Sequence, residues 1–173
     1  LSVFFIFLLS ICLSNVVYAG DRKHYVFLVH GIGAGASTFG EMKRTLKAEA
    51  ERFDPYTDWQ FINFNYQTGS DTKDVTIFAR ELGDFILDEF NKQGGLNPED
   101  QFSLVMHSQG GLIGLNLLLK SFKGEASYHP ELQHHLDAFV TMGTPYWGAK
   151  IAIFANRMMP ILSYLGIPLS ERL

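Results

Sequence analysis

The sequence predicts an α/β fold with a mostly parallel central sheet. Four short apolar stretches with the character of strands alternate with longer stretches in which apolar residues recur every three or four positions. That alternation is typical of βαβ units, whose strands run parallel. Composition agrees with a single compact domain, because 47% of the 173 residues are hydrophobic and 18% are charged.

The first expected strand is the apolar run at 25–29, which leads directly into His30-Gly31-Ile32-Gly33-Ala34-Gly35. Glycines in such a loop let the backbone approach a ligand closely and point amide hydrogens at negative charge, so the loop suits an oxyanion or a phosphate. Neither phosphate motif is matched. The loop lacks the Gly-Lys-Ser/Thr ending of a P-loop, and its glycines lack the G-x-G-x-x-G spacing.

Two helices with a strand between them are expected next. Ser37 and Thr38 are typical N-cap residues for a helix that ends at Asp54-Pro55, and a strand at 59–64 follows. A polar loop at 65–72 opens the second helix, which stops at Gly94-Gly95. The residues expected on the buried faces are Phe39, Met42, Leu46, Ala50 and Phe53 in the first helix, and Val75, Phe78, Leu82, Phe85, Ile86 and Phe90 in the second.

The third strand, at 102–106, ends beside a serine in the run His107-Ser108-Gln109-Gly110-Gly111. The pattern predicts a nucleophile elbow, a strained strand-to-helix turn that exposes the serine hydroxyl near the positive end of a helix. Ser108 is therefore the candidate nucleophile, and the alternative is a serine that only caps the helix. Met106 replaces the first glycine of the usual G-x-S-x-G pattern with a side chain that could crowd the turn. The helix beyond is expected to bury Leu112, Ile113, Leu115, Leu117, Leu118 and Leu119.

With a third motif, Gly143-Thr144-Pro145 after a strand that ends at Met142, the chain resembles the α/β-hydrolase superfamily, and within it the lipases and esterases. The resemblance covers about residues 24–150, in which the His-Gly-X-Gly loop, the x-His-Ser-x-Gly-Gly elbow and the Gly-Thr-Pro segment occur in the family's order. It implies a three-layer α/β-hydrolase fold with a mostly parallel central sheet.

The resemblance also implies roles for individual residues. The backbone amides of Ile32 and Gln109 would form the oxyanion hole. The side chain of His30 would brace the loop rather than act as a base, and that of His107 would be aimed away from the serine. The supporting residues are His30, Gly31, Gly33, His107 and Gly110, and the candidate substrate-pocket residues are Tyr146 and Trp147.

The family also needs an acidic residue and then a histidine after the elbow. After Pro145 the only carboxylate side chain is Glu171, and no histidine follows His135. His129, His134 and His135 lie at the wrong end of the sheet for these roles and are expected in a solvated polar loop, since no metal motif supports a cluster there. We therefore expect residues 20–173 to be the N-terminal two-thirds of a hydrolase domain. It would lack the C-terminal strands that carry the acid and the histidine, and would be inactive alone.

Residues 1–19 resemble a secretory signal peptide. A short apolar core at 3–13 is followed by Val17-Tyr18-Ala19, a small-residue cleavage site. Cleavage after Ala19 and a periplasmic or secreted location are expected. The alternatives are an uncleaved membrane anchor, or a lipoprotein attached through Cys12, although Ile11 is not the small residue that should precede such a cysteine. The apolar segment at 149–165 is expected to be a packed helix or a cap over the active site.

The expected function is that of a serine hydrolase cleaving carboxylic esters, a lipase or esterase acting on lipid-like substrates without a cofactor or metal. Its expected partner is a lipid or small ester, which a membrane surface could present. The net charge of −4 provides no basic surface for nucleic acid. Two alternatives remain open: a non-catalytic protein of this fold that binds a lipid or a partner, and an acyltransferase or amidase built on the same elbow.

Overall fold

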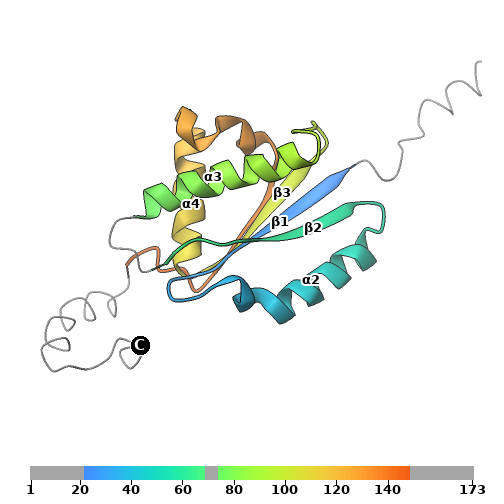
Figure 1. Cartoon of the computed structure of the whole chain (residues 1–173), viewed down its shortest axis with the longest axis horizontal. Helices are drawn as coiled ribbons and strands as arrows, with labels where there is room; N and C mark the ends of the chain where they lie inside the picture. The colour runs from blue at the N-terminus through green and yellow to red at the C-terminus, as the bar shows by residue number, and fades with distance from the viewer. Residues whose placement is uncertain (1–21, 69–73, 149–173) are drawn as a thin grey trace, which may run out of the picture.

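The computed structural model describes residues 22–68 and 74–148, which form a four-stranded sheet with helices on both faces (Figure 1). The strands are β1 (Lys23–Val29), β2 (Asp58–Phe64), β3 (Gln101–His107) and β4 (Leu136–Met142). The helices are α2 (Gly40–Phe53), α3 (Val75–Lys92) and α4 (Gln109–Phe122), with three short 3-10 helices, η1 (Ala36–Phe39), η2 (Ala126–Tyr128) and η3 (Pro130–His134). The expected α/β fold is confirmed.

The sheet has the strand order β2-β1-β3-β4, and each neighbouring pair is parallel. The carboxyl ends of all four strands therefore meet at one edge of the sheet. Ligand sites of open parallel sheets form at this edge, in the crevice beside the central strands. The loop after β1 and the turn after β3 both begin there, and because β1 and β3 are direct neighbours the two segments lie side by side.

Figure 1 shows α3 and α4 on one face of the sheet and α2 on the other. The larger apolar core lies under α3 and α4, where buried side chains of β1 and β3 meet Phe78, Leu82, Ile86, Ile113 and Leu117. The smaller core lies under α2 and is built around Val26, Leu28 and Phe39. The helix pair thus fixes the position of the elbow from one side of the sheet.

Helix α3 ends just before Gly94-Gly95, as its sequence predicts, and begins with an N-cap that was not predicted. Asp74 is the N-cap, and its carboxylate accepts hydrogen bonds from the backbone N–H groups of Thr76 and Ile77. A hydrogen bond from the Thr76 hydroxyl, and then these backbone bonds, lower the pKa of the Asp74 carboxyl. After α3 the backbone N–H of Gly95 donates to the Phe90 carbonyl at 3.0 Å, which closes the last turn of the helix.

Three expectations about the helices are wrong. Helix α2 begins at Gly40 rather than at Ser37-Thr38, because the 3-10 helix η1 takes up residues 36–39, and Phe39 at the N-cap makes no side-chain cap. Phe53 is 90% exposed and Leu119 is 51% exposed. A helical repeat defines an apolar face but not how far the neighbouring structure extends, and Phe53 is the last residue of its helix.

The segment from 126 to 135 is more ordered than the expected polar loop. It forms η2 and η3, whose Tyr128 and Leu132 are buried in the larger core. The Nε2 atom of His129 lies 2.7 Å from Asp84 of α3, and the Nδ1 atom of His135 lies 2.8 Å from the Asp100 carbonyl. The two histidine contacts and the buried apolar side chains therefore both hold this segment against its neighbours.

Among the described residues, none of the helices combines the length and the apolar character that a membrane crossing needs. The segments at 1–19 and 149–165, for which we expect a signal peptide and a packed helix or cap, lie outside the described residues.

Candidate active site

Ser108 occupies a sharp turn between β3 and α4. Its backbone has φ 53° and ψ −120°, a conformation that non-glycine residues rarely adopt and that persists only where surrounding structure imposes it. The backbone N–H of Ser108 donates to the Met142 carbonyl of β4 at 2.9 Å, and its carbonyl accepts from Gly111 at 3.1 Å. Its hydroxyl makes no hydrogen bond to any residue of the described part of the chain. The turn thus presents an uncommitted hydroxyl at the N-terminus of a helix.

Glycines allow the segments around this turn to pack closely. A Cβ atom at Gly31 would lie 2.8 Å from the Cβ of Ser108, and one at Gly110 would lie 2.4 Å from the Val29 carbonyl oxygen. Both distances are below 3.0 Å, which real Cβ atoms essentially never show. The first turn of α4 therefore rests directly on the backbone at the end of β1, and the loop after β1 touches the serine.

Met106 does not crowd the turn. Its side chain is fully buried and points into the larger core, where it lies over Gly114, one helical turn into α4. A Cβ atom at Gly114 would lie 2.1 Å from the Met106 sulfur. The methionine is accommodated because Gly114 has no side chain at the place on α4 that the Met106 side chain contacts.

The loop after β1 is held by two hydrogen bonds to one carbonyl. The Gly31 oxygen lies 2.9 Å from Nδ1 of His30 and accepts from the backbone N–H of Ala34 at 3.3 Å. An imidazole nitrogen that faces a carbonyl must carry the proton, so Nδ1 of His30 is the donor. Since a trans peptide is planar, fixing the Gly31 carbonyl also fixes the direction of the Ile32 N–H, which belongs to the same peptide.

The two amides predicted to form the oxyanion hole belong to adjacent segments. The Ile32 side chain is 60% exposed, and the Ile32 N–H makes no hydrogen bond within residues 22–68 and 74–148. Gln109 is the first residue of α4, where a backbone N–H has no partner inside the helix. Both donors are thus uncommitted. Gly33, in the same loop, has φ 69° and donates to the Thr68 hydroxyl at 3.1 Å.

Both predicted supporting histidines lie beside this turn. His30 is buried, its ring stacks on Tyr66, and its Nε2 atom has no hydrogen-bond partner among the described residues. His107 is exposed, and its ring lies beside Gly31 and Gly143. Neither ring is hydrogen bonded to Ser108. The geometry therefore gives neither histidine the contact that a general base needs in the described structure.

The segment after β4 reaches the same edge of the sheet. Thr144 packs against Gly111 of α4, so that a Cβ atom at Gly111 would collide with the Thr144 side chain. Tyr146 and Trp147 follow in a turn and are both exposed. The Gly-Thr-Pro motif thus packs on the elbow helix, and its two aromatic residues stand on the surface beyond it.

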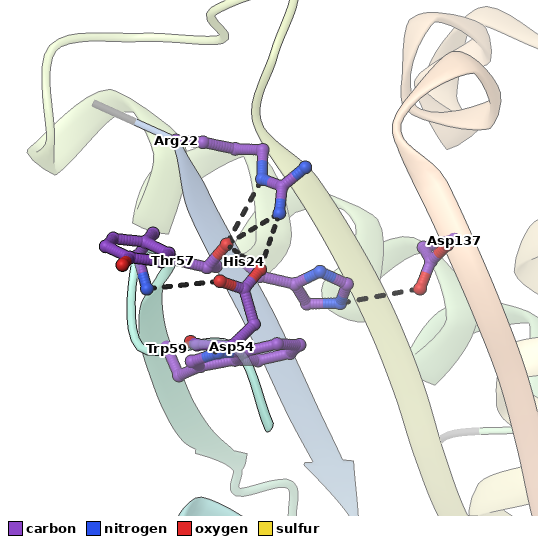
Figure 2. A network of polar contacts seen from close by, with 7 residues as sticks. Arg22, His24, Asp54, Thr57, Trp59 and Asp137 are labelled. Atoms are coloured by element: carbon purple, nitrogen blue, oxygen red, sulfur yellow. Dashed lines mark hydrogen bonds and ion pairs between the residues drawn. The ribbon is translucent and has the colours of Figure 1, made fainter. Parts of the chain in front are cut away.

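A second group of polar side chains lies at the opposite, amino end of the strands (Figure 2). His24 of β1 is buried, and its Nε2 atom lies 3.8 Å from an Asp137 oxygen, the contact drawn in Figure 2. The same nitrogen lies 2.8 Å from the Ser103 hydroxyl. The three residue types are those of a catalytic triad, but both partners face the same nitrogen, so the aspartate cannot orient the ring from its other side. Burial is the main cause that lowers the His24 pKa. The group joins β1, β3 and β4.

Sequence reasoning missed one residue of the candidate site. Tyr66 lies two residues beyond β2, and its hydroxyl donates to the His30 carbonyl at 2.8 Å and approaches Oε1 of Gln109 at 3.3 Å. Its position just past the carboxyl end of a strand was the available signal, because that is where site residues of parallel sheets gather.

Comparison with solved structures confirms the fold. Two structures of the phospholipase PlaB from Legionella pneumophila, one of them in complex with thio-NAD, match with TM-scores of 0.60 and 0.61 at 21% sequence identity. The matches cover 76% and 82% of this chain but 27% and 29% of the PlaB chain. This chain therefore spans less than a third of the solved structures that it resembles.

A curated relative covers less of the chain. The "Conditioned medium factor" of Dictyostelium discoideum is 36% identical over 95 residues, which are 54% of this chain and 11% of that protein. The model of the family described as "Putative serine esterase (DUF676)" matches residues 19–171, nearly the whole chain. The elbow, the fold and this match agree, and the chain belongs to that serine esterase family.

Proposed function

We propose that this chain carries the nucleophile and the oxyanion hole of a serine hydrolase that cleaves carboxylic esters of lipid-like substrates. The main support is the backbone of Ser108, which holds an uncommitted hydroxyl in a strained turn at the N-terminus of α4. A serine that only capped the helix would accept a hydrogen bond from the first turn, and Ser108 makes no side-chain cap.

In the proposed reaction the Ser108 oxygen attacks the ester carbonyl while a general base takes its proton. The carbonyl oxygen becomes an oxyanion, which the N–H groups of Ile32 and Gln109 stabilise, and the alcohol leaves to give an acyl-serine that water hydrolyses. Since no described histidine is hydrogen bonded to Ser108, we assign the base to a group outside residues 22–68 and 74–148. All six histidines of the 173-residue chain lie within those described residues, so we expect little or no hydrolysis by this chain alone.

Lipid-like substrates are proposed because apolar side chains are exposed on the loops after β1 and β4, the two strands that neighbour β3. Ile32, Tyr146 and Trp147 are exposed on the two loops that flank the elbow. An acyl chain would bury apolar surface against such side chains, which stabilises binding by about 25 cal/mol per Å². The phospholipase structures share the fold, and the lipid preference of this chain is our proposal.

The test is Ser108→Ala in the natural full-length product, assayed with a p-nitrophenyl ester and a phospholipid. Loss of turnover by a factor of about 10⁴ or more is expected, since the covalent route disappears. Ser127→Ala, which changes an exposed serine of η2, is the matched control and should leave turnover unchanged. Unchanged hydrolysis in Ser108→Ala would sink the assignment. Product analysis separates hydrolysis from acyl transfer or amide cleavage, since only hydrolysis of an ester yields the free acid and alcohol.

We also propose export of the protein through the signal peptide at 1–19. N-terminal sequencing of the mature protein should begin at Gly20. A protein that begins before Ala19 and fractionates with membranes would favour the uncleaved anchor, and a lipid on Cys12 would favour the lipoprotein.

A further inference from the structure

Tyr66 connects the two segments that carry the proposed oxyanion donors. Its hydroxyl donates to the His30 carbonyl at 2.8 Å, in the loop after β1, and lies 3.3 Å from Oε1 of Gln109, at the start of α4. The hydroxyl has one proton to donate, and the shorter distance indicates that its hydrogen bond is made mainly to the His30 carbonyl. One side chain from the end of β2 thus reaches both halves of the candidate site.

The ring of Tyr66 is held rigidly. It is stacked on the His30 imidazole, with centroids 4.5 Å apart and planes 10° apart, and it packs on Phe64 and Phe78 at 5.6 and 4.7 Å. The side chain is 8% exposed. Burial raises the pKa of its hydroxyl well above the usual range, so the group keeps its proton at neutral pH. A fixed ring with a permanent donor suits a positioning role.

The hydrogen bond to His30 completes the restraint on the loop. Tyr66 holds the His30 carbonyl, while His30 Nδ1 and the Ala34 N–H hold the next carbonyl, that of Gly31. Two consecutive peptide planes are therefore fixed, and with them the directions of the Gly31 and Ile32 N–H groups. Catalysis by an oxyanion hole depends on such fixed directions, because donors that need no reorganisation stabilise the developing charge best.

We propose that Tyr66 is a positioning residue, whose hydroxyl holds the backbone at His30–Ile32 in register with Gln109 so that both oxyanion donors stay aligned. The inference rests on the proposed function of Ser108 and adds a residue outside its motifs. It differs from a purely structural role in one respect: the aromatic ring alone fills the core, whereas alignment requires the hydroxyl.

Tyr66→Phe removes only the hydroxyl and keeps the stacked ring. In the natural full-length protein we expect kcat for a p-nitrophenyl ester to fall about tenfold with KM changed less than about twofold, since deleting an oxyanion donor itself costs 10²–10³-fold. Tyr128→Phe is the matched control. Tyr128 is also 8% exposed, and its hydroxyl donates to a backbone carbonyl, that of Thr76, at 3.2 Å.

Hydrogen–deuterium exchange gives a readout that does not depend on turnover. Amides of residues 30–35 should exchange faster in Tyr66→Phe than in the wild type, and at the wild-type rate in Tyr128→Phe. If the wild type hydrolyses esters and the two variants have equal kcat, the proposal is overturned, whatever the exchange shows. If the wild type has no activity, the proposed function fails by itself. The hydrogen–deuterium exchange rates then decide whether the Tyr66 hydroxyl holds the loop. Equal exchange rates at residues 30–35 in the two variants overturn that part of the proposal as well.

Discussion

Gly110 is a sensitive position of the elbow, because α4 packs there on backbone rather than on side chains. A Cβ atom at Gly110 would lie 2.4 Å from the Val29 carbonyl oxygen and 2.7 Å from that of His30. The first of these is about 1 Å short of the 3.4 Å at which ordinary contact begins. Neither carbonyl can rotate away, so Gly110→Ala must push the start of α4 off β1.

The magnitude follows from two opposing effects. Alanine favours a helix over glycine by about 1 kcal/mol. Overpacking costs about 1–3 kcal/mol and more where the neighbour is rigid, so we take the contact with backbone at about 4 kcal/mol. The net loss is about 3 kcal/mol in the free energy of unfolding. For a domain of this size that corresponds to a fall in Tm of about 6–12 °C. Displacement of Gln109 and Ser108 by about 1 Å should also lower the acylation rate about 100-fold.

The assay is thermal and urea unfolding of Gly110→Ala in the natural full-length protein, together with the labelling rate of Ser108 by a fluorophosphonate. Gly40→Ala is the matched control, since Gly40 also lies in the first turn of a helix, has the helical angles φ −47° and ψ −59°, and has no atom within 4 Å of an added Cβ. It should be neutral or stabilising by up to about 1 kcal/mol. Wild-type stability in Gly110→Ala would refute the close approach of α4 to β1.

Two further predictions concern packing and pH. Met106→Ala should lower the free energy of unfolding by about 2–5 kcal/mol. Gly114→Ala should also be destabilising by itself, but the double variant should lose less than the sum of the two, because the added methyl group fills the space that Met106 leaves. Additive losses in urea unfolding would contradict the contact. Burial lowers the pKa of His24 in the folded protein, against the opposing effect of Asp137. Between that lowered pKa and about 6.5 the unfolded chain therefore binds more protons than the folded one, and the free energy of unfolding should fall as pH drops below about 6.5. His24→Gln should have a shallower loss between about pH 7 and pH 5, and an unchanged pH dependence would show that another group is responsible.

The candidate site was predictable where its function depends on the backbone. Ser108 was found because a strand, a turn and a helix must follow one another within a few residues, and the structure gives the serine the positive φ that this turn requires. Its catalytic role, like those of Ile32 and Gln109, stays a prediction. Whether Met106 would crowd the turn could not be decided from the sequence, because Gly114, which leaves room for it, lies eight positions away and only folding brings the two together.

The contacts of Tyr66 could not be found in this way, although its place after a strand was a signal. Its neighbours His30 and Gln109 lie 36 and 43 positions away, and no local pattern links a residue after one strand to the loops after two others. The exposed Phe53 and Leu119 were misassigned for a related reason. Periodicity shows which side of a helix is apolar, but the extent of the covering sheet and helices is a property of the assembled layers.

The sequence by itself determined the α/β class, the order of strands and helices, and the turn at Ser108, because each follows from local periodicity, glycine positions and capping. The tertiary structure decided which strands became neighbours, how closely α4 rests on β1, and which side chains brace the loop after β1. Those features depend on contacts between residues far apart in the chain, and the close approach at Gly31 and Gly110 exists only once β1, β3 and α4 have packed together.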